Sequence, residues 1–338
     1  ISPSQVHRDS GSERAIPGSL CGRRPPNRGE IRAMSLYPRL DDLLELRHQA
    51  HTLGLHSHHL VNSTFAGLYA SVFRGAGVNF EEVREYREGD DIRYMDWKVT
   101  ARINEPHLKV FREERERCVM LCVDKGPHMS FGTRGTFKSV QAARAAALIG
   151  WAASRLNDRV GGIVFGDPVA GVQHFRPSRG RRALWQMLRT LTVPGNTQDK
   201  SIDCLAQALQ RATMGLPTGS LVFVIANLNR EPMDLERILG NLIQRNSVAL
   251  IPVDDPADWE IPAMGVSTFT GTDGTLIEID TDDPQARRQY RDTWEERREM
   301  IQAMAYRLNV ILLPIRTDEE IHLSLIHHLE QQARMRAV

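Results

Sequence analysis

The sequence predicts an α/β fold in which a doubly wound, mostly parallel sheet carries helices on both faces. Three observations predict it. Short apolar runs such as Cys118 to Val123 and Leu221 to Ala226 are typical of buried strands, amphipathic stretches such as Arg181 to Leu191 are typical of helices, and the two kinds alternate. Strands that are apolar on both faces and alternate with helices indicate a parallel sheet covered on both sides.

The chain is expected to begin with a disordered extension, residues 1–33. This stretch is rich in Pro, Gly, Ser and Arg, has no hydrophobic periodicity and precedes the first methionine, Met34. It lacks the apolar core of a secretion signal, and the acidic residues Asp9, Glu13 and Glu30 argue against a transit peptide. The extension therefore contributes nothing to the predicted fold.

Residues 34–116 are predicted to form an N-terminal helix and a partly β segment. The helix is expected over Leu40 to Leu55, because leucines recur there with helical spacing. They follow Asp41, a residue that suits a helix cap or a first turn. The helix is therefore the entry element of the fold.

The second part of that region, residues 74–117, is dense in charge. Its basic and acidic side chains alternate almost to neutrality, which favours internal ion pairs over a site for polyanions. Trp97 and Val99 are spaced for short strands and turns, and a turn signal stands at Gly89. We expect an irregular, partly β segment that packs against the following domain.

Residues 117–338 are predicted to form the α/β domain with a C-terminal helix. After a strand over Cys118 to Asp124, the patterns predict the following elements in order: helix Phe137 to Leu156, strands Val160 to Phe165 and Gly171 to Phe175, helices Arg181 to Leu191 and Ile202 to Met214, strand Leu221 to Ala226, helix Leu235 to Arg245, strand Val248 to Val253, two β-like pieces around Gly271 to Asp280, helix Pro284 to Leu308, strand Val310 to Pro314 and helix Ile321 to Met335. The short connection over Asp167-Pro168 predicts one antiparallel hairpin at an edge of the sheet.

Composition and charge exclude several classes of protein. A formal net charge of +1 creates no field that would attract a polyanion, so no nucleic-acid partner is expected. No apolar run reaches the ~18 residues of a membrane-spanning helix, so no integral membrane segment is expected. The four cysteines are scattered, which does not suggest a disulfide framework, and a cytoplasmic location is the simpler interpretation.

One local group of basic residues stands out from this neutral balance. Arg176, Arg179, Arg181 and Arg182 immediately precede or begin a predicted helix. Such a group can face an acidic partner. A solvated loop is the more common explanation and is the interpretation favoured here.

No complete catalytic or nucleotide-binding motif is present. The chain has neither G-x-S-x-G nor H-E-x-x-H. The stretch Gly132 to Ser139 lies between a strand and a helix and suggests phosphate binding through Lys138, but a Walker loop needs Gly directly before the Lys, where Phe137 stands. Capping of the helix by Thr136 is the better interpretation.

Several motifs together resemble a known bacterial family. They are Arg74-Gly75-Ala76-Gly77-Val78-Asn79-Phe80, the block from Arg84 to Lys98 with Thr100-Ala101-Arg102, Met129 to Gly132, Asp158 to Gly161 and the helix Leu325 to Arg334. They resemble the family catalogued as domain of unknown function 58, whose members carry a von Willebrand factor A-like domain and are often encoded beside MoxR-type AAA+ ATPases. The resemblance runs from Leu36 to the end of the chain, and its most specific residues are Arg84, Gly89, Asp90, Asp91, Arg93, Asp96, Trp97, Lys98 and Arg102.

The resemblance implies a metal ion-dependent adhesion site at the carboxyl ends of the strands. In such a site an Asp-x-Ser-x-Ser loop, a Thr and an Asp hold Mg²⁺ through oxygen atoms. Asp124 and Thr197 match two of these positions. Gly126 and His128 replace the two serines, and Asn227 stands where the family usually has an acid. We therefore expect a degenerate site with Asp124 and Thr197 as the remaining candidate ligands and with no cofactor: Mg²⁺ is disfavoured, and a transition metal on Asp124 and His128 is a lesser alternative.

Two functions are open at this point. The resemblance implies a non-enzymatic adaptor or scaffold that works with a MoxR-type AAA+ ATPase in the assembly or maturation of other proteins. Its partner-binding loops are expected to contain Asp124, Gly126, His128, Ser130, Thr197 and Asn227. The alternative is a divalent-metal-dependent hydrolase that uses Asp90, Asp91 and Asp96, although arginines in the same stretch favour salt-bridged turns there.

Overall fold

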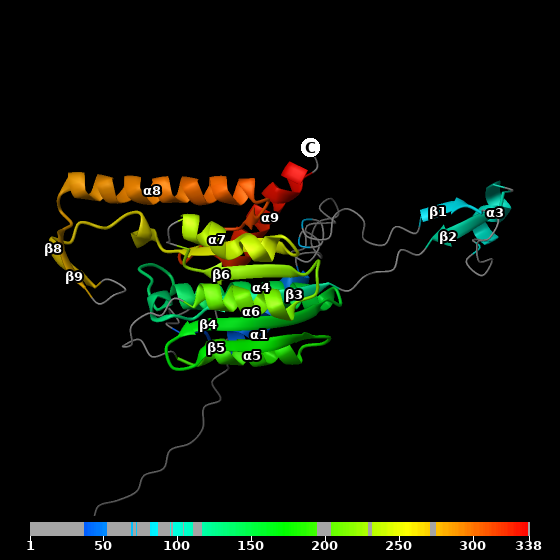
Figure 1. The fold of residues 1–338 in the computed structure, drawn as a ribbon, viewed down its shortest axis with the longest axis horizontal. Helices are drawn as coiled ribbons and strands as arrows, with labels where there is room; N and C mark the ends of the chain where they lie inside the picture. The colour runs from blue at the N-terminus through cyan, green and yellow to red at the C-terminus, as the bar shows by residue number, and fades with distance from the viewer. Residues whose placement is uncertain are drawn as a thin grey trace, which may run out of the picture. The chain divides into compact units, whose positions relative to one another are not determined.

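The computed structural model describes a central sheet with helices on both faces (Figure 1). The described residues are 37–52, 69, 72, 82–86, 95, 97–103, 105–110, 117–194, 204–228, 232–270 and 275–336. Within them, a seven-stranded sheet has the order β10-β7-β6-β3-β4-β5, and β11 also pairs with β7. Its strands are β3 (Cys118–Asp124), β4 (Arg159–Asp167), β5 (Gly171–Ser178), β6 (Leu221–Ala226), β7 (Ser247–Asp254), β10 (Ile311–Leu312) and β11 (Ile315–Arg316).

All neighbouring strands of this sheet run parallel except β4 and β5. The predicted doubly wound, mostly parallel sheet is therefore confirmed. The predicted edge hairpin is confirmed as well, since β5 lies at one end of the strand order and pairs antiparallel with β4. The turn of that hairpin is held by the Asp167 carboxylate, which accepts the N–H groups of Val169 and Ala170, each at 3.0 Å.

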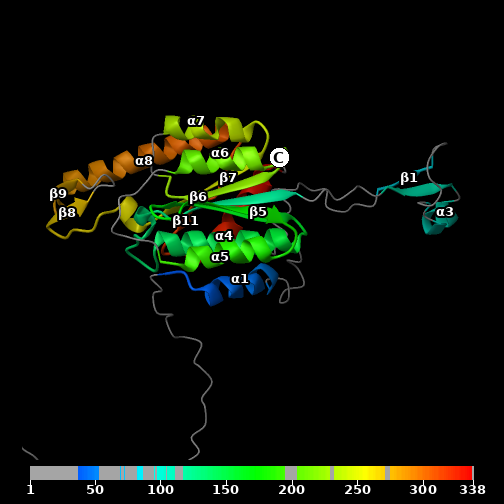
Figure 2. The same cartoon turned by 60° about the horizontal axis from the view of Figure 1, so that its bottom comes forward.

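Helices cover both faces of the sheet (Figure 2). On one face lie α1 (Leu40–Thr52), α4 (Lys138–Arg155), α5 (Arg182–Thr192) and α9 (Ile321–Arg336), and on the other lie α6 (Leu205–Gly215), α7 (Pro232–Ile243) and α8 (Pro284–Arg307). Most of these elements begin and end within a few residues of the predicted limits.

Strand β3 explains why the core has two halves. Every residue of the strand is buried. Val119, Leu121 and Val123 pack into the core on the α4 side, while Met120 and Cys122 pack into the core on the α6 side, because successive side chains of a strand point to opposite faces. Only a strand that is apolar at every position can serve two cores in this way.

Helix α1 is attached to the domain by packing and by a side-chain hydrogen bond from α4. Leu43 and Leu46 are buried in the core beneath α4. The indole N–H of Trp151 on α4 donates to the Leu43 carbonyl oxygen at 3.0 Å. The predicted amphipathic helix is thus an integral part of the α/β core.

Of the strand predictions near the C-terminus, one is confirmed and one was wrong in detail. The two β pieces expected around residues 271–280 are β8 (Val266–Thr270) and β9 (Leu276–Asp280), which form an antiparallel hairpin. The single strand expected over residues 310–314 is interrupted at Pro314, which has no N–H to continue the ladder, so β10 and β11 are separate.

The described residues between 82 and 110 contain two strands and a helix, which are considered by themselves. Strand β1 (Glu82–Glu85) pairs antiparallel with β2 (His107–Val110), which confirms the partly β character of this segment. The prediction that Trp97 and Val99 lie in strands or turns was wrong, because both belong to the helix α3 (Trp97–Ile103). Its sequence contains no Gly or Pro that would break a helix, although Val99, Thr100 and Ile103 are β-branched and favour extended structure in the absence of other contacts. Packing of this segment against the following domain remains a prediction.

The predicted disordered extension, residues 1–33, lies outside the described residues. Among the helices that are described, none is both long and apolar enough to cross a bilayer.

The attachment of α1 can be tested with Trp151→Phe. This variant keeps an aromatic ring in the core but removes the hydrogen bond to Leu43, so the free energy of unfolding should fall by about 1 kcal/mol. Urea unfolding followed by circular dichroism measures this change. Trp185→Phe is the matched control, because Trp185 is exposed on α5. A similar loss in both variants would contradict the assigned role of Trp151.

Candidate functional site

At the carboxyl end of β3 lies a buried carboxylate whose two oxygens accept hydrogen bonds from the turn that follows. Asp124 is the last residue of β3 and is buried. Its Oδ1 accepts the N–H of Gly126 at 2.9 Å, and its Oδ2 accepts the Nε2–H of His128 at 2.9 Å. His128 lies in a short 3-10 helix, η2 (Pro127–Met129). We call residues 124–130 the Asp124 turn.

Two glycines make room for this carboxylate and imidazole. A Cβ on Gly126 would lie 2.5 Å from Cε1 of His128, and a Cβ on Gly166 would lie 2.6 Å from Oδ1 of Asp124. Gly166 also has a φ of 90°, which disfavours any other residue. The packing of the turn therefore depends on the absence of these two side chains.

The residues of the Asp124 turn do not fit the Mg²⁺ site that the resemblance implies. Mg²⁺ needs several oxygen ligands in an octahedral array. Here Gly126 offers no side-chain oxygen, His128 offers nitrogen, and both oxygens of Asp124 already accept hydrogen bonds. Within the part of the chain that the structure describes, no three His, Cys, Asp or Glu side chains are placed to share a metal ion.

The other predicted loop residues are only partly brought together. Ser130 ends the Asp124 turn, and its N–H donates to the Pro127 carbonyl oxygen. Asn227 follows β6, which is hydrogen-bonded to β3, so the two loops leave the same edge of the sheet. Thr197 lies outside the described residues.

The motif residues of the 74–117 segment have different outcomes. Arg84 lies on β1, and Trp97, Lys98 and Arg102 lie on α3. The remaining predicted motif residues lie outside the described residues: Gly89, Asp90, Asp91, Arg93 and Asp96. The acidic cluster of the alternative hydrolase hypothesis is therefore not described, and that hypothesis stays a prediction.

A second buried carboxylate, Asp255, ties three segments together at the same edge of the sheet. It accepts the N–H and the hydroxyl of Thr133 at 2.8 and 2.5 Å, and the hydroxyl of Thr317 at 2.5 Å. It also caps the 3-10 helix η3 (Pro256–Asp258). Burial raises the pKa of Asp255, but the hydrogen bonds from Thr133, Thr317 and Ala257 outweigh burial and hold the pKa below its usual value.

Lys138 completes this cluster and is not available to a nucleotide. The residue is 1% exposed, and its ammonium group lies 2.8 Å from a carboxylate oxygen of Asp258. The predicted cap at Thr136 was wrong, because α4 has Phe137 at its N-cap position and no side chain caps it. The N–H of Lys138 instead donates to the Phe131 carbonyl oxygen at 2.8 Å, so backbone takes the place of a cap.

Sequence reasoning missed Asp255 and Asp258 as determinants of the site. A signal was present in the sequence. Two acids, Asp254 and Asp255, directly follow the apolar run of a buried strand, and Pro256 comes next. A further acid, Asp258, stands three residues after Asp255, as in a capped helix start. The partners of these carboxylates lie more than a hundred residues earlier in the chain, at Thr133 and Lys138. No local pattern connects such distant positions.

A cavity of about 750 Å³ opens beside this cluster at the end of β7. The rings of Trp259 and Trp294 are 5.3 Å apart, and the guanidinium groups of Arg316 and Arg298 lie over them. Arg298 also forms an ion pair with Asp254. Burial raises the pKa of Asp254 although the positive charge of Arg298 opposes this shift. The cavity adds a concave aromatic wall to the carboxyl edge.

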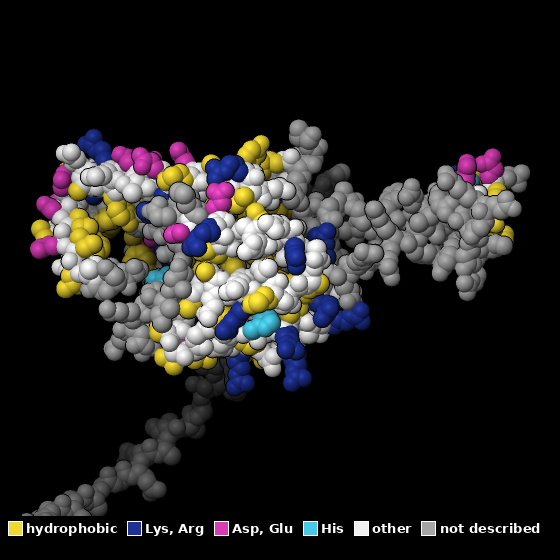
Figure 3. Space-filling view, in the orientation of Figure 1, with side chains coloured by type: hydrophobic (Ala, Val, Ile, Leu, Met, Phe, Trp, Pro, Cys, Tyr) yellow, Lys and Arg dark blue, Asp and Glu magenta, His cyan; other side chains and the backbone are white. Residues whose placement is uncertain are grey.

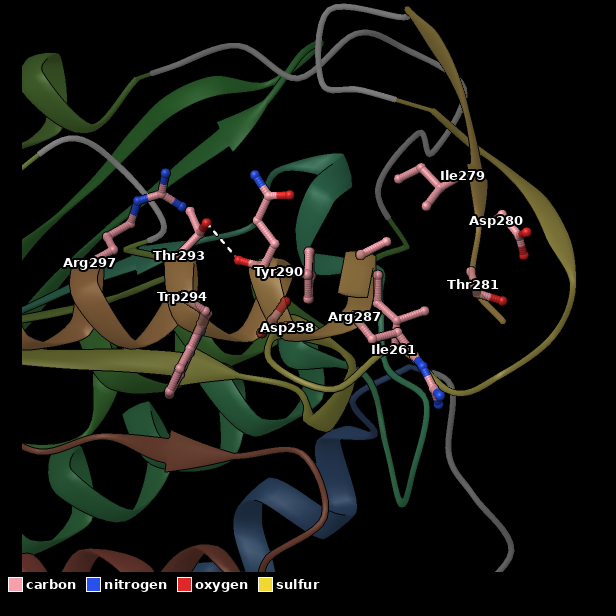
Figure 4. A pocket seen from close by; sticks show the side chains of 12 residues that line it. Asp258, Ile261, Ile279, Asp280, Thr281, Arg287, Tyr290, Thr293, Trp294 and Arg297 are labelled. Carbon is pink, nitrogen blue, oxygen red and sulfur yellow. Dashed lines mark hydrogen bonds between the residues drawn. The ribbon is translucent and has the colours of Figure 1, made fainter. Parts of the chain in front are cut away.

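A smaller cavity of about 310 Å³ lies between the β8–β9 hairpin and α8 (Figure 4). Ile261, Tyr290 and Trp294 contribute apolar surface to it. The hydroxyl of Tyr290 donates to the Ala257 carbonyl oxygen at 3.0 Å. Burial and the nearby carboxylate of Asp258 raise the pKa of Tyr290 to about 12, so the phenol is a neutral hydrogen-bond donor.

Comparison with known proteins agrees with the resemblance seen in the sequence. The model of a family described as "Protein of unknown function DUF58" matches residues 82–300. The chain belongs to this family. Similar proteins include the uncharacterized protein Rv1480 of Mycobacterium tuberculosis and the uncharacterized protein Mb1516 of Mycobacterium bovis, each 27% identical over 269 residues, which is 80% of this chain and 84% of the relative. The DUF58 match includes the Asp124 turn and, of the Asp255 cluster, Asp255 with Thr133, Lys138 and Asp258, whereas Thr317 lies beyond it.

The Asp255 cluster predicts a specific acid dependence of stability. Asp255→Asn leaves the donors of Thr133 and Thr317 without a charged acceptor, which should lower the unfolding free energy at pH 7 by roughly 3 kcal/mol. Because the folded-state pKa of Asp255 is depressed, its contribution is fully present above the unfolded pKa of about 3.9 and is lost as the pH falls through the folded value.

Denaturant titrations between neutral and acidic pH measure this effect. Wild type should lose stability more steeply below about pH 4 than Asp255→Asn does. Asp292→Asn, an exposed change on α8, is the matched control and should follow wild type. If the unfolding free energies of all three proteins fell equally with decreasing pH, the role assigned to the Asp255 carboxylate would be contradicted.

The poor fit of the Asp124 turn to Mg²⁺ can be tested with the double variant Gly126→Ser and His128→Ser, which restores the two serines of the adhesion-site loop. Removing the imidazole clears the space that a serine at 126 needs and adds two hydroxyl ligands beside Asp124. The double variant should bind Mg²⁺ at least about tenfold more tightly than wild type, a difference of about 1.4 kcal/mol in calorimetry. Tight Mg²⁺ binding by wild type would show that the closed turn does not exclude the ion.

Proposed function

We propose that this DUF58 protein is a non-enzymatic adaptor that binds another protein through the loops at the carboxyl edge of its sheet. The observation that carries the proposal is the closed Asp124 turn, whose carboxylate is satisfied by His128 and by the Gly126 N–H. A degenerate adhesion site of this kind has no open position for a partner's carboxylate on a metal. It acts through the shape and the exposed side chains of the surrounding loops, which include those after β3 and β4 and which we call the rim.

The rim has two properties that suit protein recognition. It is rigid, because Asp255 holds the loop at Thr133 and Asp167 holds the β4–β5 turn and pairs with Lys125 at 3.3 Å. It also exposes apolar side chains, since Phe131 is 44% exposed and Val169 is 79% exposed. Preorganised loops that present apolar groups bind a partner with little ordering cost.

The proposed partner is a MoxR-type AAA+ ATPase, and the proposed process is the assembly or maturation of other proteins. This part of the proposal rests on the family resemblance. The compartment we propose is the cytoplasm, because Cys118, Cys122 and Cys204 are buried free thiols, as a reducing environment allows. Burial raises the pKa of Cys122 to about 12, so that thiol is unreactive.

The experiment measures binding of purified protein to a MoxR-type ATPase from the same genome, with and without a non-hydrolysable ATP analogue. Calorimetry should give saturable binding in one nucleotide state. Phe131→Ser and Val169→Asp should each weaken it by about tenfold, because an apolar contact point is lost from the rim.

Tyr306→Ser supplies the matched control. Tyr306 is 90% exposed at the end of α8, shortly before β10, whose Ile311 pairs with Ala249 near the start of β7. It therefore lies toward the amino edge of the sheet, away from the rim, and its loss should leave the affinity unchanged. Absence of binding in every nucleotide state, or equal effects of rim and control variants, would refute the proposal.

A further inference from the structure

One surface of the α/β domain, away from the carboxyl edge, is formed by a stretch of the chain, residues 155–189, whose exposed Asp, Glu, Lys and Arg side chains are all positively charged. Between residues 155 and 189 all seven basic residues are exposed arginines, which we call the arginine surface: Arg155, Arg159, Arg176, Arg179, Arg181, Arg182 and Arg189. Figure 3 shows dark-blue side chains gathered around β5 and α5, with magenta side chains gathered over α8.

The two acidic residues of this stretch do not neutralise the surface. Asp158 and Asp167 are both buried. The carboxylate of Asp158 accepts the N–H of Arg117 at 3.2 Å, and that of Asp167 pairs with Lys125. The carboxylates of this segment thus serve internal contacts, whereas its arginine residues are exposed.

The edge strand β5 adds to this positive character. Arg159 donates to the Pro177 carbonyl oxygen, and Arg211 of α6 donates to the Val172 carbonyl oxygen at 2.7 Å. These contacts occupy two backbone acceptors of β5 and fix two arginine side chains beside this strand. Partial burial together with the charges of Arg176 and Arg211 lowers the pKa of His174 on β5.

Helix α5 places an aromatic side chain among these arginines. Its inner residues Leu184, Met187 and Leu188 are buried, so the helix is firmly held. Trp185 on the outer side is 41% exposed, with Arg182 three residues before it and Arg189 four residues after it on the same helical face. Arginine and tryptophan are the residue types most often found at the energetic centre of protein interfaces.

The neighbouring helix argues for a compact partner. Helix α1 packs against α5 and carries Asp41, Asp42 and Glu45 on its N-terminal half. A long polyanion laid across the arginine surface would meet these carboxylates, whereas a short acidic segment need not. Trp185 further requires an apolar group on the partner, which a phosphate backbone does not supply.

We propose that the arginine surface binds an acidic segment of a partner protein, with carboxylates on the arginines and an apolar side chain on Trp185. This is a second surface, formed by residues other than those of the proposed rim. An arginine fork matches a carboxylate with two parallel hydrogen bonds, and such pairs strengthen where an adjacent ring excludes water. Binding is therefore expected to weaken as salt increases.

The test uses the full chain and a synthetic 14-residue peptide of alternating Glu and Asp with one central Phe. Calorimetry should detect saturable binding that weakens with salt. Arg182→Glu combined with Arg189→Glu should reduce the affinity by about tenfold to a hundredfold, and Trp185→Ala by about tenfold. These residues are exposed, and thermal unfolding checks that each variant is folded.

The control variant is Arg288→Glu combined with Arg334→Glu, which makes the same change in net charge at exposed positions of α8 and α9. Its peptide affinity should stay near that of wild type. No peptide binding, or an equal loss in the control, would overturn the proposal. Tighter binding to a single-stranded RNA oligonucleotide or to phosphatidylserine vesicles than to the peptide would likewise overturn the assignment to a protein partner. Peptide binding retained in Phe131→Ser would show that this surface acts independently of the rim.

Discussion

The buried carboxylate of Asp255 holds together the edge of the sheet on which the candidate site is built. It gathers hydrogen bonds from Thr133, which follows β3, and from Thr317, which follows β11, while capping its own turn. A buried charge is stable only when all of its partners are in place, so these segments are either correctly arranged together or destabilised together. The neighbouring pair of Lys138 and Asp258 then fixes the start of α4. The Asp255 cluster therefore determines the shape of the rim.

The centre of the same edge is organised by a second internal contact. Asp124 stands where the resemblance implies a metal ligand, yet its oxygens accept from Gly126 and His128. A side chain at position 126 would collide with the His128 imidazole, and one at position 166 would collide with the Asp124 carboxylate, so this arrangement requires glycine at both. Polar groups that elsewhere would face a ligand are therefore used to stabilise the turn. What remains for recognition is the outer surface of rigid loops, which is the physical basis for proposing an adaptor.

Charge is distributed unevenly over a chain whose formal net charge is only +1. Helix α8 carries acids and bases together, and several of its arginines pair with carboxylates, as Arg298 does with Asp254 and Arg307 with Glu236. In the stretch from 155 to 189 the carboxylates are buried and the arginines are exposed. A sum over the sequence cannot reveal this separation, because burial decides which charges reach solvent. Two surfaces with different chemistry can therefore coexist on one nearly neutral protein.

The sequence by itself determined the fold class, the edge hairpin and the DUF58 family, because apolar periodicity and motif spacing are local properties that survive without coordinates. It also placed Asp124 and His128 in one turn, since they are four residues apart. It did not predict the α3 helix, where Trp97 and Val99 were assigned to strands or turns, or the division of the strand at Pro314. Only the tertiary structure decided the partners of Asp255 and Lys138 and the exposure of the arginines around Trp185. Those features arise from contacts between segments far apart in the chain, and the free energy of burying a charge depends on all of them at once.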